Sequence, residues 1–393
     1  MIAGLDQEGL RRLLREERLP AMLLDAGAFD RNVETLVAVA RAAGKTIRIA
    51  TKSIRSAPLL RRVARIGGPT VQGLLTYSAT ETAFLAGQGF DDLLLGYPTV
   101  QTADLEDLAR VAALGRRVSA AVDSPEQIDA LGSAACGAPI GAVLDVDMSW
   151  RPLGGLLHVG VRRSPVRTAA RAIELARRVR ETAGVRLAGL LAYEAQIAGL
   201  ADAGPLHRRV KRWSLPDVAR RRREVVEALR SAGFALDLVN GGGTGSIHTT
   251  ADEEVVTEVS VGSGFLCPHL FDHYDSLRLE PAAFFALRVD RVPDARHVTC
   301  HGGGYVASGQ AGPDRLPVPV MPCGLDLLPF EGAGEVQTPL RVRRGARAPA
   351  LGDPVIFRHA KSGELAEHFA RILLVSGGEV VERIPTYRGE GMS

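Results

Sequence analysis

Short apolar segments and amphipathic segments alternate from about residue 46 to residue 265, and this alternation allows few folds. The apolar segments have strand length, and the segments between them carry apolar residues at three- and four-residue spacing, as in Ala103–Leu114 and Thr168–Thr182. Strands that alternate with helices form parallel sheets covered by those helices. We therefore expect an α/β fold with a (β/α)8 TIM-like barrel, and an open doubly wound sheet is the second interpretation. The expected strands are Thr46–Lys52, Thr70–Leu75, Asp92–Gly96, Val118–Val122, Ala142–Asp147, Leu187–Tyr193, Leu236–Asn240 and Glu258–Val261.

Beyond residue 280 the pattern changes to short strands separated by glycine and proline turns, with one helical turn near Leu365. We interpret residues 280–393 as an all-β domain, on which residues 1–20 could pack, and residues 21–275 as the barrel domain. Ala21–Asp25 is a further strand that either joins the β domain or caps the barrel. Two domains agree with a length of 393 residues, which is too long for one ordinary core. The strands expected in the β domain are Val289–Thr299, Pro317–Met321, Pro339–Val342, Val355–Phe357 and Ala370–Val375.

Charge and cysteine content narrow the class of protein. The net charge is +3 and the basic residues are scattered, so nothing indicates binding of nucleic acid. Apolar runs stay far below the ~18 residues that span a bilayer, and the N-terminus lacks a signal-peptide core. The arginine run Arg220–Arg223 is interpreted as one solvated helix face, with a phosphate or partner patch as the alternative. A reduced, cytoplasmic chain with buried thiols is expected because no CxxC pair occurs among Cys136, Cys267, Cys300 and Cys323.

Polar residues and glycines gather at or just after the expected strand ends. Barrel active sites form at the C-terminal face of the strands, so this distribution indicates a functional face, although loops are polar in general. The residues concerned are Lys52, Gly73, Tyr97, Asp123, Asp147, Tyr193–Glu194, Asn240–Ser246 and Gly262–Gly264.

Lys52 ends the apolar segment Ile47–Ala50 after a single threonine. Burial of an ammonium is costly unless the group is paired or used. A desolvated lysine at a strand end can form a Schiff base, since burial lowers its pKa and frees the amine. The alternative is a lysine that extends to the surface.

A glycine cup, Asn240–Ser246 with Gly262–Gly264, follows the last two expected strands. Consecutive glycines let backbone amides approach an anion closely, and hydroxyls can add donors. The sequence lacks the ending of a Walker loop, and Ser246 stands where a dinucleotide fingerprint has its last glycine. We expect the cup to hold one phosphate, and a tight turn without ligand is the alternative.

A lysine on the first strand and a phosphate cup on the last two would face each other across the barrel mouth. Pyridoxal phosphate (PLP) needs this combination, an amine for its aldehyde and an anion site for its phosphate. A class I aldolase uses a similar pair but needs no second β domain. The residues therefore favour a PLP protein.

The chain resembles the fold type III PLP enzymes, which have the alanine racemase-like architecture, and within them the D-threonine aldolase and D-serine dehydratase group. The matching segments include Arg48–Lys52, Gly160–Arg162, the Tyr193 strand end, the glycine cup, Gly352–Val355 and His359–Lys361. Bacterial amino acid deaminase/aldolase proteins are similar also at Gly160–Pro165, His301–Tyr305, Glu331–Thr338 and Thr386–Gly391. The resemblance implies a homodimer and a Schiff base on Lys52. It implies that PLP is held by Lys52, Tyr193, Asn240, Gly242, Gly243, Thr244, Gly245, Ser246, Gly262, Ser263 and Gly264.

The chain departs from this group at three positions. Relatives bind a divalent metal through His-x-Asp or His-x-Cys, whereas this chain has His359-Ala360-Lys361. A protonated lysine cannot ligate a metal, so we expect none, or one bound through His359 with ligands from elsewhere. Lys361 would then take the place of the ion. His158 replaces a frequent arginine, and Gln196 replaces a frequent histidine.

The resulting hypothesis is a PLP-dependent lyase for β-hydroxy D-amino acids, acting by retro-aldol cleavage or by dehydration. His359 would be the base on the hydroxyl, Lys361 would stabilise the oxyanion and Tyr193 would contact the cofactor ring. Substrate contacts are expected from Arg151, Arg162, Gln196 and Tyr305. One alternative is an amino acid racemase that takes Tyr305 or Tyr274 from a partner subunit as its acid or base. Another is a PLP carrier without catalysis, against which the β domain argues.

Overall fold

A computed structural model describes residues 5–392. Eight parallel strands close into a barrel in the order of the sequence, from β2 to β9, and β9 pairs with β2 through Glu258 and Thr46. This closure confirms the TIM-like barrel and excludes the open doubly wound sheet. The barrel strands are β2 (Thr46–Ala50), β3 (Val71–Thr76), β4 (Leu93–Leu95), β5 (Val118–Val122), β6 (Ile140–Asp145), β7 (Val185–Ala192), β8 (Leu238–Gly241) and β9 (Glu258–Val261).

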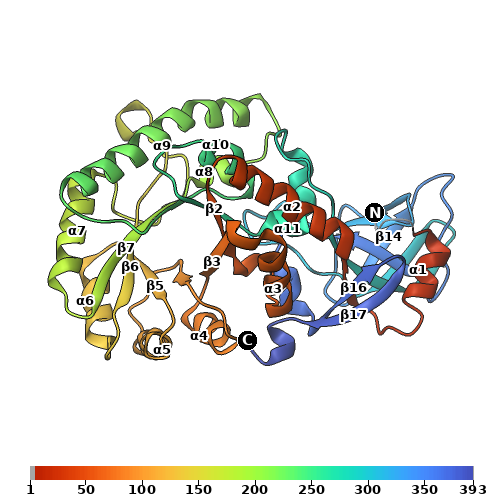
Figure 1. Ribbon diagram of the computed structural model, residues 1–393. Coiled ribbons are helices and arrows are strands. Elements are labelled where there is room, and N and C mark those ends of the chain that lie inside the picture. Colours follow the sequence, from red (N-terminus) through yellow and green to blue (C-terminus); the bar gives the residue numbers. More distant parts are fainter. Residues whose placement is uncertain (1–4, 393) are drawn as a thin grey trace.

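Helices surround the barrel on its outside (Figure 1). Helix α3 shows how the sequence places them, because Pro58 lies in its first turn, Gly68 caps its end, and Leu59, Leu60 and Val63 are fully buried. The two helices expected at residues 103–114 and 168–182 lie within one residue of those bounds. The helices are α2 (Ala26–Ala42), α3 (Ala57–Gly67), α4 (Ala79–Gly87), α5 (Thr102–Ala113), α6 (Pro125–Ala134), α7 (Ala169–Glu181), α8 (Ala195–Ala198), α9 (Pro205–Ser231), α10 (Ile247–Ala251) and α11 (Ser263–Leu266).

Arg48 fills part of the barrel interior. Its side chain is 2% exposed and pairs with Glu258 at 2.7 Å and with Asp92 at 3.1 Å. The Asn240 side chain joins the same group, since its Nδ2 donates to Glu258 Oε1 at 2.7 Å and its Oδ1 accepts from Ser260. A buried guanidinium is tolerated only when it is paired in this way. The barrel is therefore closed below its mouth by polar side chains that satisfy one another.

A nine-stranded sheet forms the second domain, which confirms the all-β expectation. Its main path is β13-β14-β11-β10-β1-β16-β17, while β15 pairs with β10 and β12 pairs with β15. Strand β1 lies inside this sheet, so the range of residues 21–275 includes one strand that pairs outside the barrel. The segment expected as one strand at 289–299 is a hairpin, because the chain turns between Asp294 and His297. The strands are β1 (Ala21–Asp25), β10 (Ala283–Asp294), β11 (His297–His301), β12 (Val318–Met321), β13 (Leu325–Leu327), β14 (Gln337–Val342), β15 (Pro354–Arg358), β16 (Arg371–Ser376) and β17 (Glu379–Pro385).

The N-terminal segment packs on the sheet, as expected for the described part of residues 1–20. Helix α1 (Gln7–Leu13) brings Leu10 into a buried cluster with Leu23 and Phe284. Arg11 also pairs with Asp353 at 2.6 Å. After β17 the chain returns to the barrel near α3 and α4 (Figure 1), where the Ser56 hydroxyl donates to the carbonyl of Pro385. The sheet domain is thus tied to the barrel beside the end of β2.

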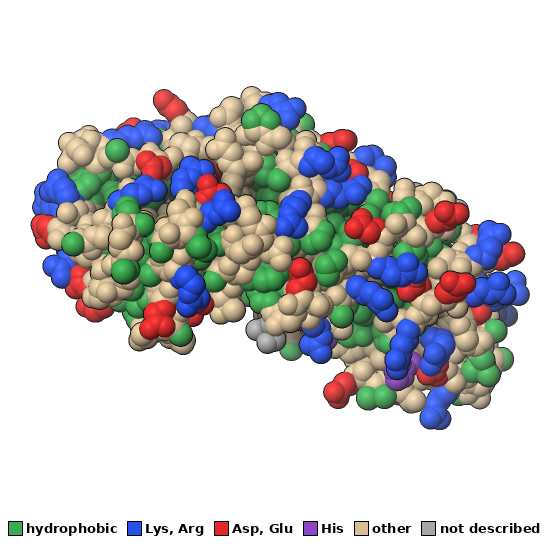
Figure 2. Space-filling view, turned by 60° about the horizontal axis from the view of Figure 1, so that its bottom comes forward, with side chains coloured by type: hydrophobic (Ala, Val, Ile, Leu, Met, Phe, Trp, Pro, Cys, Tyr) green, Lys and Arg blue, Asp and Glu red, His purple; other side chains and the backbone are tan. Residues whose placement is uncertain are grey.

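The surface and the cysteines give three further results. On the face shown in Figure 2, basic and acidic side chains are interspersed. Between residues 5 and 392, no helix has the length and hydrophobicity that a membrane crossing requires. Cys267 and Cys300 are buried as expected, but Cys136 and Cys323 are exposed, so the expectation of buried thiols is wrong for these two.

Candidate active site

Lys52 lies in a 3-10 turn, Thr51–Ser53, at the C-terminal end of β2. Its side chain is exposed at the barrel mouth, and its Nζ lies 2.9 Å from the hydroxyl of Tyr97, which follows β4. The expected burial of Lys52 is wrong for the single chain, because β2 ends at Ala50 and the lysine falls in the turn instead of the strand. The amine is accessible and has one phenol as its polar neighbour.

The glycine cup adjoins this lysine. Strands β8 and β9 end at the cup, and β9 is the direct neighbour of β2 in the closed barrel. The Ser263 hydroxyl lies 3.1 Å from the hydroxyl of Ser53, the residue after Lys52. The expectation that the lysine and the cup face each other across the mouth is therefore wrong. They lie side by side, because barrel closure makes the first and last strands neighbours.

Close packing explains the glycines of the cup. A Cβ at Gly245 would lie 2.2 Å from the carbonyl oxygen of Ala198 and 2.5 Å from the Tyr274 ring. A Cβ at Gly264 would lie 2.4 Å from Thr244, whose hydroxyl accepts the Gly264 amide at 3.1 Å. These approaches leave no space for any other residue type at the two positions. The cup is a compact, preformed structure with small polar residues at its edge.

Glu194 holds the cup from beneath, and the sequence did not single it out for this role. Its carboxylate is 1% exposed and accepts hydrogen bonds from the Gly242 amide at 3.1 Å, the Ser246 hydroxyl at 2.7 Å and the Thr250 hydroxyl at 2.5 Å. Gly242 and Ser246 therefore direct these donors toward Glu194. Gly243, Thr244, Gly245, Gly262, Ser263 and Gly264 form the rest of the cup, whereas Asn240 points into the barrel.

Arg222 balances the charge of Glu194. Its guanidinium is fully buried on α9, lies 2.6 Å from Glu194, and also pairs with Glu253. Arg221 is buried as well and donates to the carbonyls of Asp147 and Ser149. The expectation of a solvated arginine face is thus wrong for these two residues and holds for the exposed Arg220 and Arg223. Residues that are three or four positions apart lie on the same face of a helix. Arg221 and Arg222 therefore share the buried face of α9 with Val225 and Val226.

Tyr193 stands at the end of β7 beside the cup. A Cβ at Gly243 would lie 3.4 Å from its ring, and the Arg163 guanidinium lies over the ring at 5.8 Å. Burial, together with the nearby charge of Glu194, raises the pKa of Tyr193 to about 12, so the phenol stays neutral. Tyr193 can therefore offer a flat apolar face and a neutral hydroxyl.

Two carboxyl groups line the mouth between β5 and β7. Burial, with a smaller contribution from Asp123, raises the pKa of Asp145 to about 7, and burial also raises the pKa of Asp123. Arg163 opposes the shift at Asp145. Asp145 was not singled out from the sequence, because the fifth expected barrel strand was given an end at Asp147, whereas the corresponding strand β6 ends at Asp145.

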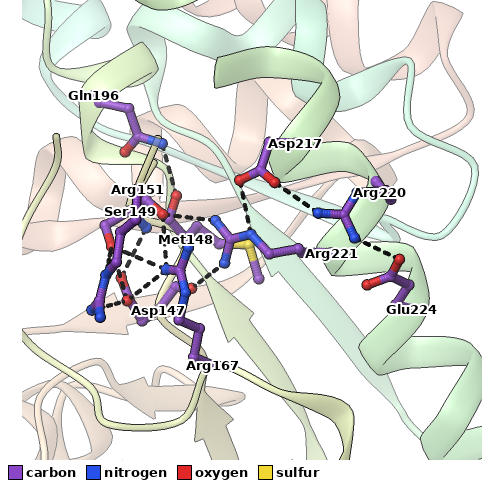
Figure 3. Close-up of polar contacts among 10 residues, drawn as sticks. All are labelled: Asp147, Met148, Ser149, Arg151, Arg167, Gln196, Asp217, Arg220, Arg221 and Glu224. Atoms are coloured by element: carbon purple, nitrogen blue, oxygen red, sulfur yellow. Dashed lines mark hydrogen bonds and ion pairs between the residues drawn. The ribbon is translucent and has the colours of Figure 1, made fainter. Parts of the chain in front are cut away.

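Figure 3 shows two of the expected substrate-binding residues, Arg151 on the loop after β6 and Gln196 on α8. Arg151 pairs with Asp147 at 2.6 Å, and Arg167 reaches the same carboxylate at 3.0 Å. The Gln196 side chain donates to the carbonyl of Met148 at 2.7 Å, while its Oε1 is buried without a partner in the described chain. Arg151 and Gln196 thus fix this loop, whereas Arg162 is exposed.

His359, Lys361 and Tyr305 line one small pocket with Glu364 and His368, which confirms that the fold brings these three predicted residues together. His359 is 2% exposed, and burial with the nearby Arg358 lowers its pKa to about 3. Lys361 is exposed and its Nζ donates to Ser308 at 3.1 Å.

The same pocket adjoins the lysine turn. A Cβ at Gly363 would lie only 2.2 Å from the Lys52 carbonyl oxygen. The pocket residues thus come from the second domain of the same chain, and Gly363, which lies in the sequence between Lys361 and Glu364, contacts the backbone of Lys52.

The residues present fit PLP but do not fit a divalent metal. An accessible amine, a neutral tyrosine ring and a preformed glycine cup supply what the aldehyde, ring and phosphate of PLP need. For a metal, residues 5–392 contain no group of three or more histidine, cysteine or acidic side chains arranged as ligands. Lys361 adds a positive charge where a cation would have to bind.

Comparison with known proteins identifies the family and similar enzymes. Residues 24–267 match the family model described as alanine racemase, N-terminal domain, whose members bind PLP. A D-threonine aldolase from Arthrobacter sp is 25% identical over 338 residues, which cover 85% of this chain and 82% of that protein. A 3-hydroxy-D-aspartate aldolase from Paracoccus denitrificans is 26% identical over 250 residues, covering 63% of this chain and 60% of the relative.

Solved structures share the fold. The D-threonine aldolase from Filomicrobium marinum superposes with a TM-score of 0.83 at 23% identity, with 95% of each chain covered. D-threo-3-hydroxyaspartate dehydratase from Delftia sp. HT23 superposes with a TM-score of 0.74 at 19% identity, covering 95% of this chain and 98% of the other. The chain belongs to the alanine racemase N-terminal domain family, within its group of D-threonine aldolases, 3-hydroxy-D-aspartate aldolases and D-threo-3-hydroxyaspartate dehydratases.

Proposed function

We propose that this chain is a PLP-dependent lyase that acts on β-hydroxy D-amino acids, by retro-aldol cleavage or by dehydration. The observation that carries the proposal is the accessible amine of Lys52 beside the glycine cup, with Tyr97 at 2.9 Å. Relatives named as aldolases and as a dehydratase of such amino acids support the substrate class.

Each part of the site has a distinct task in this proposal. Lys52 would bind PLP covalently, with the phosphate in the cup and the ring beside Tyr193. PLP supplies an electron sink for the carbon that loses a substituent. Tyr97 can exchange a proton with Lys52 Nζ directly, since a hydrogen bond already joins the two atoms. The exposed Arg162 and Arg163 offer cations for the substrate carboxylate at the mouth.

We assign the substrate hydroxyl to the pocket of Lys361, Tyr305 and His359. A lysine ammonium stabilises an oxyanion that develops beside it without any metal. His359, with a pKa of about 3, is neutral, so it would accept the hydroxyl proton as a weak base, and Lys361 would stabilise the oxyanion that remains.

We also propose a homodimer. The loop between Trp150 and Val159, closed by a two-hydrogen-bond bridge, exposes Leu156 at 86% beside the barrel mouth. Phe330 is fully exposed on the sheet domain. Large apolar side chains at such exposure mark association surfaces when they cluster, and the neighbouring Leu153 and Leu157 extend the first patch.

Trapping and product analysis test the function. The chain has four lysines, Lys45, Lys52, Lys211 and Lys361, so borohydride reduction of the PLP-loaded protein followed by mass spectrometry identifies the bonded residue directly. We expect the label on Lys52. Lys211→Ala is the matched control, because Lys211 pairs with Asp202 at 2.8 Å, and this variant should keep the label on Lys52.

Products then distinguish the reactions. Aldehyde with glycine indicates cleavage, and ammonia with a keto acid indicates dehydration. Inversion with loss of α-deuterium would indicate a racemase, and PLP binding without turnover would indicate a carrier. A label on another lysine, or no product from any β-hydroxy D-amino acid, would refute the proposed function.

A further inference from the structure

Arg55, three residues after Lys52, adopts a backbone conformation that arginine rarely takes. Its φ angle is +52°, in the left-handed region that glycine usually occupies. A non-glycine residue there costs about 1 kcal/mol or more, and such residues persist only where other contacts hold them. The contacts of Arg55 therefore merit explanation.

Four contacts converge on Arg55. Its Nε donates to the carbonyl of Lys52 at 3.0 Å, and its guanidinium lies 4.8 Å from the centre of the Tyr77 ring. The guanidinium also pairs with Glu367, and its own carbonyl accepts the Tyr387 amide at 2.9 Å. The Arg55 side chain is 17% exposed, whereas its partner Glu367 is 39% exposed.

Two of the partners belong to the sheet domain. Glu367 lies in the 3-10 turn Glu364–His368, and Tyr387 follows β17. From the same domain, Gly363 approaches the Lys52 carbonyl so closely that no Cβ could be accommodated. The sheet domain thus acts on the Lys52 turn in two ways, directly through Gly363 and indirectly through Arg55.

We propose that Arg55 is a positioning residue, through which the sheet domain of the same chain fixes the backbone of Lys52 and thereby the place of its amine. This inference rests on the proposed function, since it assumes that Lys52 binds PLP. Arg55 does not itself contact the cofactor in this assignment. Its charge-assisted bond to the Lys52 carbonyl restricts the turn, and the ion pair with Glu367 orients the guanidinium that makes this bond.

The test uses Arg55→Gly, because glycine adopts the left-handed backbone without strain, so the change removes the side chain with its contacts to Lys52, Tyr77 and Glu367 and adds no backbone strain. We expect this variant to have the same unfolding midpoint as the wild type. Its affinity for PLP should be about tenfold lower, which is the loss expected for one charge-assisted hydrogen bond. PLP retention is read by visible absorbance and by borohydride trapping at Lys52. Added methylguanidinium should restore much of the trapping.

Controls separate positioning from general stability and from failure of the proposed function. Arg62→Ala removes a comparable ion pair on α3, with Asp30 at 2.6 Å, and should trap PLP as the wild type does. Glu367→Gln should show a weaker form of the Arg55→Gly effect. Retention within about twofold of the wild type in Arg55→Gly, loss without methylguanidinium rescue, or equal loss in Arg62→Ala would overturn the inference. Absence of any Lys52 adduct in the wild type would instead overturn the proposed function.

Discussion

Replacement of Arg222 by methionine should destabilise the barrel severely. The guanidinium is 0% exposed, lies 2.6 Å from Glu194, pairs with Glu253 and donates to the carbonyl of Ala192 at 2.8 Å. Methionine has a similar volume, so the substitution leaves no large cavity and removes mainly the charge. Two carboxylates, one of them 1% exposed, then remain without a cation.

The size of the effect follows from this geometry. Removal of one partner from a buried ion pair costs about 3–5 kcal/mol, because the remaining charge loses its compensation. The Arg222→Met variant strands two carboxylates instead of one, so we expect the upper part of that range. Glu194 also organises the glycine cup, so PLP retention should fall together with stability.

The loss should depend on pH. Burial already raises the pKa of Glu253 in the wild type, and loss of the Arg222 guanidinium, which opposes this shift, should raise it further above its unfolded value. Protonation below that folded pKa removes the stranded charge, so the deficit should be largest at pH 8 and should shrink toward pH 5. The slope is up to about 1.4 kcal/mol per pH unit for each titrating group.

Denaturation by urea, followed by tryptophan fluorescence, measures this loss. The chain has two tryptophans, Trp150 and Trp213, whose rings lie 6.3 Å apart in the barrel domain, so the signal reports barrel unfolding. Arg223→Met is the control on the same helix and should change stability by less than about 0.5 kcal/mol, since Arg223 is exposed. A deficit below about 1 kcal/mol, or one independent of pH between 5 and 8, would refute the reasoning.

Four further predictions concern other parts of the protein. Glu81 is a buried residue of α4, and burial raises its pKa to about 7 from 4.5, so the stability that the protonated carboxyl allows is present at low pH and lost as the pH rises through 7. The free energy of unfolding of Glu81→Gln, measured by urea titration, should therefore rise relative to that of the wild type by up to about 3 kcal/mol between pH 5 and 8. A difference between the two proteins that stays constant with pH would contradict this. Gly245→Ala should lose about 1–3 kcal/mol and release PLP through overpacking, whereas Gly87→Ala, with open space around its Cβ, should be neutral or stabilising in the same thermal melts. Tyr97→Phe should slow borohydride trapping at Lys52 about tenfold at neutral pH, and an unchanged trapping rate would remove Tyr97 from proton exchange. Leu156→Asp should convert a dimer into a monomer in sedimentation experiments without changing the unfolding midpoint, and a dimer of unchanged affinity would exclude this loop from the interface.

Much of the architecture could be predicted because local patterns carry it. The alternation of apolar segments and amphipathic helices gave all eight barrel strands within a few residues, and glycine and proline turns marked the second domain. Most of the residues expected near PLP lie at one face of the barrel because they follow strand ends, which barrel closure brings together. The triplet His359–Lys361 was singled out by resemblance to relatives, and in the fold Gly363, two residues after it, contacts the Lys52 turn.

The errors arose where a residue's partner is distant in the sequence. Arg222 was taken as solvated because only the folded chain brings to it Glu194, which follows β7, and Glu253, which lies between α10 and β9. The burial of Lys52 was misjudged because a two-residue difference in the end of β2 moves a side chain from the strand to the mouth.

The sequence by itself determined the barrel, the β domain and the kind of chemistry, since hydrophobic periodicity and residue type are local properties of the chain. Only the tertiary structure decided that Lys52 and the glycine cup are neighbours, that Glu194 and Arg222 support the cup, and that Arg55 connects the sheet domain to Lys52. These relations depend on barrel closure and domain docking, which join residues as far apart in the sequence as Ser53 and Ser263. The tertiary structure decides which buried charges pair and which backbone segments make close contact, because each of these requires a partner that no local pattern specifies.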